Sequence, residues 1–135
     1  AAADYVSLHL PLTPATRGMI NAEALAQMKP TAYLINTSRG AIIDDVALLA
    51  ALDSGQLAGA ALDVMSSEPP PPDHPLLQHP RVIATPHVAF YSEAATIDLA
   101  AKAARHVAQA LRGEIPARVV NPAVLSQANC RLMRR

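Results

Sequence analysis

Residues 34–64 read LINTSRGAIIDDVALLAALDSGQLAGAALDV, and this stretch decides the fold. It starts as an apolar strand and turns polar at residues 36–40. A helix is predicted over 44–55, because two aspartates suit the positive end of the helix dipole and a glycine suits the position that closes a helix. Residues 57–64 are apolar without alternation, which is typical of a strand in a parallel sheet covered by helices on either side. The stretch therefore predicts a strand–helix–strand unit of an α/β protein.

The same alternation continues on both sides of this stretch. Further strands are predicted over 4–10 and 81–87, and a short helix over 21–29. A long alanine-rich helix is predicted over 92–112 and is closed by a glycine. Because strands joined through helices pair in parallel by right-handed crossovers, the four predicted strands should form one parallel sheet.

The composition fits this fold and excludes several classes of function. Hydrophobic residues make up 51% of the 135 residues but aromatic residues only 3%, so aliphatic side chains must fill the core, as in helices packed on a sheet. Cys130 is the only cysteine, which excludes an internal disulfide and a cysteine zinc site and fits a reducing, cytoplasmic compartment. No apolar run reaches the roughly 18 residues that span a bilayer, so no membrane partner is expected.

Charge is distributed unevenly along the chain. Ten of the eleven acidic residues precede residue 101, whereas seven of the eleven basic residues follow it. The basic segment lacks the aromatic residues or the recognisable module of nucleic-acid-binding proteins, so no nucleic acid is expected, and residues 123–135 are expected to be a poorly ordered basic tail. Asp73, His74 and His79 approach a metal-ligand group, but the prolines among them give no helical or hairpin spacing, so no metal site is expected.

Polar residues follow every predicted strand at the end where a parallel sheet binds its ligands. Arg39 follows the second strand, Asp63 and Glu68 follow the third, and His87 follows the fourth. Ligands of open parallel sheets lie outside the carboxyl ends of the strands, because loops there can gather polar groups without unpairing the sheet. These four side chains are therefore predicted to share one site.

The residue types at these strand ends indicate an anionic substrate and a reaction with proton transfer. Arginine can hold a carboxylate through two parallel hydrogen bonds, which suggests an anionic substrate. Histidine can exchange a proton near neutral pH, and a glutamate on its far ring nitrogen would orient the ring. Taken singly, His87 is explained as a loop residue, Arg39 as a surface or helix-dipole residue and Asp63 as a cap. Their coincidence at one sheet edge favours the site.

The stretches INTSRGAIIDDVALLAALDSGQLAGAALDVMSSEPPPPDHPLL and VIATPHVAFYSEA together resemble the D-isomer-specific 2-hydroxyacid dehydrogenases. The resemblance covers about residues 4–122, and HVAFYSEAA is most similar to the phosphoglycerate dehydrogenase-like and C-terminal binding protein-like branch. It implies a partial Rossmann-type parallel sheet with flanking helices and a long C-terminal alanine-rich helix. Residues 1–122 would then be the C-terminal portion of a dinucleotide-binding domain, followed by the basic tail 123–135.

The resemblance also implies roles for individual residues. Arg39, in NTSRG, matches the arginine that holds the substrate carboxylate and carbonyl, His87 the acid/base and Glu68 its partner. Phe90 matches a position that shapes the substrate pocket together with Arg39. The residues that the resemblance places around the cofactor are His9, Pro11, Thr13, Thr37, Ser38, Arg39, Asp63 and His87.

The chain departs from the family pattern in the part that binds the cofactor. The G-x-G-x-x-G turn, whose backbone amides bind the cofactor pyrophosphate, has no counterpart among the five glycines. The resemblance implies NAD as the cofactor, and NADP is not excluded, because the residue that reads the adenosine ribose is also absent. The first strand would lack a neighbour, so we expect a fragment of a longer product, which pairs with the missing N-terminal part, or a homodimer.

Three functions follow from the resemblance. The first is an oxidoreductase that transfers a hydride between NAD(P)(H) and the CH–OH carbon of a small 2-hydroxy/2-keto acid, with the isolated chain expected to be inactive. The second is an NAD(H)-sensing, protein-binding module of the corepressor type. The third is a non-functional gene remnant.

Overall fold

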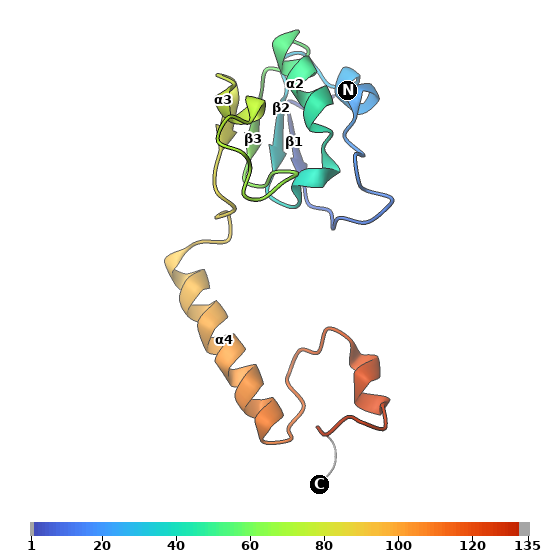
Figure 1. Ribbon diagram of the computed structural model, residues 1–135, viewed down its shortest axis with the longest axis vertical. Helices are drawn as coiled ribbons and strands as arrows, with labels where there is room; N and C mark the ends of the chain where they lie inside the picture. The colour runs from blue at the N-terminus through green and yellow to red at the C-terminus, as the bar shows by residue number, and fades with distance from the viewer. Residues whose placement is uncertain (1, 133–135) are drawn as a thin grey trace. The chain divides into compact units, whose positions relative to one another are not determined.

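A computed structural model describes residues 2–132 of the chain. The chain divides into two compact units, Ala1–Ala89 and Phe90–Arg135, and each is described by itself. The first unit holds the sheet and three of the four helices, whereas the second consists of the long helix and the segment that follows it (Figure 1).

The first unit is built on a four-stranded parallel sheet in the order β1-β2-β3-β4. The strands are β1 at Tyr5–Leu8, β2 at Tyr33–Asn36, β3 at Gly59–Leu62 and β4 at Val82–Ala84. All three neighbouring pairs are parallel, as predicted from the alternation of strands and helices. The strands are shorter than the predicted stretches, because the polar and proline residues at their carboxyl ends belong to loops. These carboxyl ends consequently meet at one edge.

Short helices connect the strands, and the sequence explains where they begin. Helix α1 spans Ala22–Ala26, and its cap Asn21 accepts a hydrogen bond from the Ala24 amide. Helix α2 spans Asp45–Asp53 and begins at Asp44, whose carboxylate accepts hydrogen bonds from two amides of the first turn. Gly55, which the sequence analysis placed at the end of this helix, has a φ of +77°.

Two short elements of the first unit were not predicted. A 3-10 turn, η1, spans Gly40–Ile42, and helix α3 spans Pro75–Gln78. Neither is long enough to show a helical period in the sequence. Pro75 is compatible with α3 because it occupies the first helical turn, where its missing amide is not needed.

The core lies on one face of the sheet. Buried leucines of α1, α2 and α3 form one cluster with Leu8, Leu34, Ala60 and Leu62 of the strands. Figure 1 shows α2 over the strands of this unit. Aliphatic side chains fill the cluster, as the composition predicted.

The opposite face of the sheet is uncovered in the described part of the first unit. Strand register places Tyr5, Tyr33 and Ile83 on this face, and they are 68%, 44% and 71% exposed. The two tyrosine rings stack on each other at 5.7 Å between centroids. The expectation of helices on either side is therefore met on one side only, because the three helices of this unit all contribute to the same core.

The second unit begins with helix α4, which spans Glu93–Leu111 and is capped by the Ser92 hydroxyl. Gly113 follows the helix with a φ of +76°, as expected for a residue that closes a helix. A 3-10 helix, η2, spans Pro122–Ser126, inside the segment that we expected to be a poorly ordered tail. That expectation and the boundary at residue 122 stay predictions, and residues 133–135 lie outside the described residues. No helix in the described part of the chain is long and apolar enough to cross a membrane.

Replacing a core leucine of α2 should destabilise the first unit strongly. Leu48 is fully buried, so Leu48→Ala should lower the free energy of unfolding by about 3 kcal/mol through lost burial and a residual cavity. Val46, in the same helix, is 79% exposed, and Val46→Ala should change it by less than about 0.5 kcal/mol. Urea unfolding followed by circular dichroism measures both, and equal effects would contradict the assigned core.

Candidate active site

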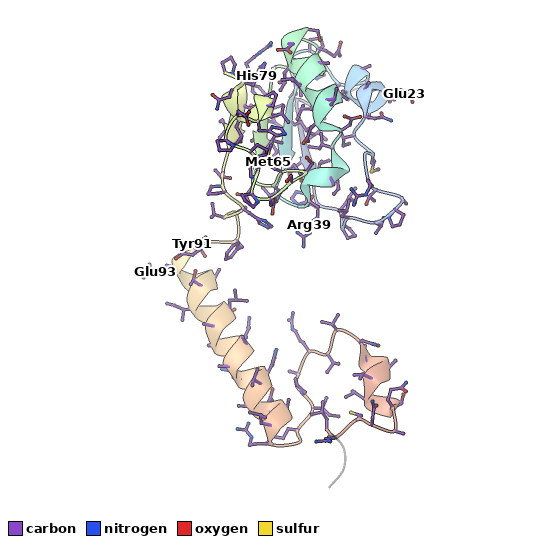
Figure 2. The ribbon with its side chains drawn as sticks, in the orientation of Figure 1. Glu23, Arg39, Met65, His79, Tyr91 and Glu93 are labelled. Carbon is purple, nitrogen blue, oxygen red and sulfur yellow. The ribbon has the colours of Figure 1, made fainter. Side chains whose placement is uncertain are left out.

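The four side chains predicted to share one site, Arg39, Asp63, Glu68 and His87, lie in the loops that follow β2, β3 and β4. The strand arrows in Figure 1 point to the end of the unit at which Arg39 is labelled in Figure 2. Arg39 comes three residues after β2, Asp63 directly after β3, and His87 three residues after β4. Parallel pairing therefore brings the loops of these residues to one edge, as the sequence predicted.

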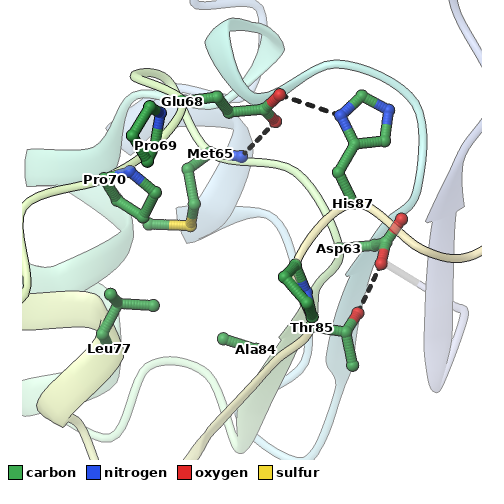
Figure 3. A pocket seen from close by; sticks show the side chains of 10 residues that line it. Asp63, Met65, Glu68, Pro69, Pro70, Leu77, Ala84, Thr85 and His87 are labelled. Atoms are coloured by element: carbon green, nitrogen blue, oxygen red, sulfur yellow. Dashed lines mark hydrogen bonds and ion pairs between the residues drawn. The ribbon is translucent and has the colours of Figure 1, made fainter.

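His87 and Glu68 form a direct pair. His87 Nδ1 lies 2.8 Å from Glu68 Oε2, and the second carboxylate oxygen, Oε1, accepts a hydrogen bond of 3.1 Å from the Met65 amide (Figure 3). Both side chains are partly open to solvent, at 47% and 40% exposure. Because Nδ1 faces the carboxylate, the other ring nitrogen, Nε2, remains available to a ligand.

Asp63 holds the loop that carries His87. Its side chain is buried, and its carboxylate accepts hydrogen bonds from the Thr85 hydroxyl, the Val88 amide and the Ala89 amide. The His87 amide also donates to the Asp63 carbonyl oxygen at 2.8 Å. Asp63 thus fixes the backbone on both sides of the histidine, a role that spacing alone did not indicate. Its predicted contact with the cofactor stays a prediction.

His87 has a positive φ of 54°, which is uncommon for a residue with a side chain. The hydrogen bonds that Asp63 receives from the residues after His87 hold the chain in this conformation. Residues held in sparsely populated backbone conformations cluster at functional sites, where the surrounding structure determines them. The backbone therefore supports the assignment of His87 to the site.

Asn36 organises the turn that carries Arg39, and the sequence analysis missed it. Its buried side chain donates to the Arg39 carbonyl oxygen at 2.9 Å and accepts from the amide and the hydroxyl of Ser38. An asparagine at the last position of an apolar strand could have signalled this, because a buried amide must find partners and asparagine commonly bonds to nearby backbone. Arg39 itself is exposed, and its guanidinium donates to the Ser38 carbonyl oxygen at 2.6 Å.

The site lowers the pKa of both carboxylic acids. The hydrogen bond from His87 is the main reason that the pKa of Glu68 lies below its usual value, although partial burial opposes it. The Met65 amide and the charges of His87 and Arg39 lower it further. Burial alone would raise the pKa of Asp63, but its hydrogen bonds and the charge of His87 outweigh this effect and lower it. Both acids are therefore carboxylates at neutral pH.

The other predicted contacts are spread over two loops and both units. His9 Nε2 lies 2.8 Å from the Ser7 hydroxyl, and the Thr16 hydroxyl ties Pro11 and Thr13 into one turn. Phe90 belongs to the second unit, where its ring meets Tyr91 edge-on at 5.9 Å. The binding roles predicted for His9, Pro11, Thr13, Thr37, Ser38 and Phe90 stay predictions.

A cavity of about 330 Å³ lies beside the His87–Glu68 pair, which we call the dyad. Its walls are mostly apolar and include Met65, Leu77 and Ala84, with Glu68 and His87 at its rim (Figure 3).

Within residues 2–132, no three side chains of the metal-ligating types lie close enough to hold an ion. His74 and His79 face Asp45 and Asp53 instead.

The lowered pKa values predict a loss of stability in acid. The usual pKa values of Asp63 and Glu68 are 3.8 and 4.5, so the folded protein binds fewer protons than the unfolded chain as the pH falls through these values. The contribution of both acids should be complete above about pH 5 and decline as the pH falls toward the lowered values.

Asp63→Asn tests how much Asp63 contributes to the loss of stability in acid. It should lower the free energy of unfolding at pH 7 by about 1–2 kcal/mol, because one acceptor oxygen becomes a donor facing an amide. It should also make the decline in acid shallower. Urea unfolding at several pH values measures both quantities, and an unchanged pH dependence would show that Asp63 is not a source of the loss.

The sequence and the fold are both similar to those of known proteins. Residues 1–89 match the family described as D-isomer specific 2-hydroxyacid dehydrogenase, NAD binding domain. A glyoxylate reductase from Thermofilum pendens is 49% identical over 122 residues, which cover 90% of this chain and 36% of that protein. This chain therefore spans about a third of the length of that relative.

Solved structures agree with this match. The NAD-complexed D-isomer specific 2-hydroxyacid dehydrogenase from Lactobacillus delbrueckii ssp. bulgaricus is 37% identical with a TM-score of 0.80, covering 87% of this chain and 40% of that one. The enzyme from Xanthobacter autotrophicus Py2, in complex with NADPH and MES, is 39% identical with a TM-score of 0.72, covering 90% and 49%. The chain therefore belongs to the D-isomer specific 2-hydroxyacid dehydrogenase family, and its first 89 residues match that family's NAD-binding domain.

Proposed function

We propose that the protein is an oxidoreductase that interconverts a small 2-hydroxy acid and the corresponding 2-keto acid with a nicotinamide dinucleotide. The observation that carries this proposal is the hydrogen-bonded His87–Glu68 pair, which lies on loops at the carboxyl edge of a parallel sheet beside the loop of Arg39. The names of the relatives, a glyoxylate reductase among them, support a 2-keto acid as the substrate class.

Three residues would have separate roles in the proposed reaction. The Arg39 guanidinium would bind the substrate carboxylate through two hydrogen bonds, since its side chain is exposed at the carboxyl edge of the sheet. His87 Nε2 would donate a proton to the keto oxygen during reduction and accept it during oxidation. Glu68 would orient the ring through Nδ1 and stabilise its protonated form, as the carboxylate beside a catalytic histidine does in other enzymes.

The described residues fit one part of the cofactor. The open edge of the sheet beside the dyad suits the nicotinamide end, with His9, Pro11, Thr13, Thr37, Ser38 and Asp63 as the proposed neighbours. When bound, the nicotinamide supplies or accepts the hydride. The pyrophosphate finds no matching turn, because the three glycines with positive φ, Gly18, Gly55 and Gly113, lie singly in different loops. We therefore propose NAD, or NADP, with the phosphates held by chain outside this sequence.

His87→Gln tests the acid/base role in the longest product that contains this chain. The change should lower kcat for 2-keto acid reduction by about 100-fold or more, because glutamine cannot transfer the proton, and should change the Kd for NADH far less. Arg39→Lys should instead raise the KM for the acid by about tenfold, because lysine cannot form the bidentate contact. Steady-state rates and fluorescence titration with NADH measure these values.

His79→Gln is the matched control, since His79 lies three residues before β4, at the opposite edge of the sheet, with its Nε2 3.5 Å from Asp53 Oδ1. It should leave both constants unchanged. If NADH binds but no acid of a broad panel is turned over by the wild-type protein, the NAD(H)-sensing module becomes the better reading. If the wild-type protein neither binds NADH nor turns over any acid, a non-functional gene remnant becomes the better explanation.

The uncovered sheet face supports a further part of the proposal, which concerns partners. Parallel sheets are almost always covered on both faces, and this chain spans 36% of the glyoxylate reductase that it matches. We propose that the face bearing Tyr5, Tyr33 and Ile83 is covered by a part of the nucleotide-binding domain that this sequence does not contain, or by a second copy of the chain.

A single cysteine supports a cytoplasmic location.

A charge on this face should show whether it is covered. The 135-residue chain should associate with itself as its concentration rises, and Ile83→Glu should weaken that association by at least about tenfold, because a carboxylate would be buried without a partner. Val46→Glu, equally exposed but on α2, is the control and should have little effect. Sedimentation velocity distinguishes the outcomes, and a wild-type chain that stays monomeric would contradict pairing through a second copy.

A further inference from the structure

The carboxylate of Glu68 depends on the position of a whole loop. Glu68 lies at the end of residues 63–68, which we call the β3 loop, and its Oε1 is fixed to the amide of Met65 in the same loop. Figure 3 shows the carboxylate between this amide and the His87 ring. Any displacement of the β3 loop would therefore carry Glu68 away from His87.

Gly40 lets the β3 loop approach the loop of Arg39. A Cβ atom at Gly40 would lie 1.9 Å from the Met65 carbonyl carbon, 2.0 Å from its oxygen and 2.4 Å from the Ser66 nitrogen. These are backbone atoms, so they cannot rotate away as the end of a flexible side chain could. Glycine is required here for space, and it directly follows Arg39 in the chain. The two loops are thus packed backbone to backbone.

Asp45 holds the β3 loop from the other side. The Ser66 hydroxyl donates a short hydrogen bond to Asp45 Oδ2, and His74 Nε2 lies 3.6 Å from the same oxygen. The other ring nitrogen, Nδ1, accepts from the Leu76 amide, so in a neutral ring the proton is on Nε2 and points to Asp45. Asp45 is the first residue of α2, and the carboxylate therefore ties the β3 loop and the start of α3 to that helix.

We propose that Gly40 and Asp45 are positioning residues that hold the β3 loop where Glu68 meets His87. Neither residue contacts the dyad itself, and each acts through the backbone or the side chain of residues 65 and 66. Gly40 sets how close the loop can come, and Asp45 keeps it there. The consequence for turnover rests on the proposed function, whereas the consequence for the Glu68 carboxylate does not.

The pKa of Glu68 reports the pairing directly and needs no activity. Carbon-13 NMR titration of the Glu68 carboxyl should give a higher pKa in Gly40→Ala, Ser66→Ala and Asp45→Asn than in the wild type, shifted toward the value in His87→Ala. Gly55→Ala is the glycine control, because its Cβ would meet nothing within 4 Å, although its φ of +77° makes the change strained. Asp44→Ala is the helix control, since it removes the cap of α2 without touching the β3 loop.

The two controls should lower stability and leave the pKa of Glu68 at its wild-type value. In the longest active product, Asp45→Asn should lower kcat by about 10- to 100-fold with the KM for the acid unchanged. A wild-type Glu68 pKa in folded Gly40→Ala overturns the proposal. Should that variant not fold, a wild-type value in both Asp45→Asn and Ser66→Ala overturns it. If the wild-type protein shows no turnover, this result counts against the proposed function alone. The NMR titration of Glu68 does not depend on activity, so it still tests the positioning roles of Gly40 and Asp45.

Discussion

The buried carboxylate of Asp63 is the interaction on which the site depends. It ends β3 and receives hydrogen bonds from a threonine before His87 and from two amides after it. A buried carboxylate is costly unless its oxygens are paired, so the loop after β4 must close around it for the fold to be stable. That closure holds His87 in a positive-φ conformation and joins the third and fourth strands of the sheet at their carboxyl ends. Stability and the proposed function are therefore coupled at one residue.

The dyad illustrates how loops of a parallel sheet create chemistry without unpairing strands. Glu68 and His87 are 19 residues apart in the chain, and each is anchored separately, one by the Met65 amide and the other by Asp63. Both remain partly exposed, so the proposed substrate would be able to reach the ring while the carboxylate orients it. The turn organised by Asn36 presents Arg39 from the neighbouring strand in the same way. Each side chain is placed by a buried polar group behind it.

The uncovered sheet face and α4 both expose large apolar side chains among the described residues. Ile97, Leu99 and Leu111 on α4 are all more than half exposed, as are Tyr5 and Ile83 on the sheet. Large exposed apolar patches are uncommon on monomeric proteins and mark surfaces that bind something. This agrees with a sequence that spans about a third of a longer relative. Part of what stabilises the family's fold would then lie outside these 135 residues.

The sequence by itself determined the strands, the two main helices and the edge at which the polar residues gather. Periodicity, the two aspartates at the start of α2, the glycines that close α2 and α4, and the rule that parallel strands end together are local or topological, so they can be read without coordinates. Only the tertiary structure decided the contacts across loops. The space at Gly40, the three bonds to Asp63 and the side chain of Asn36 depend on which backbone atoms come close after folding, and spacing along a chain does not encode that distance.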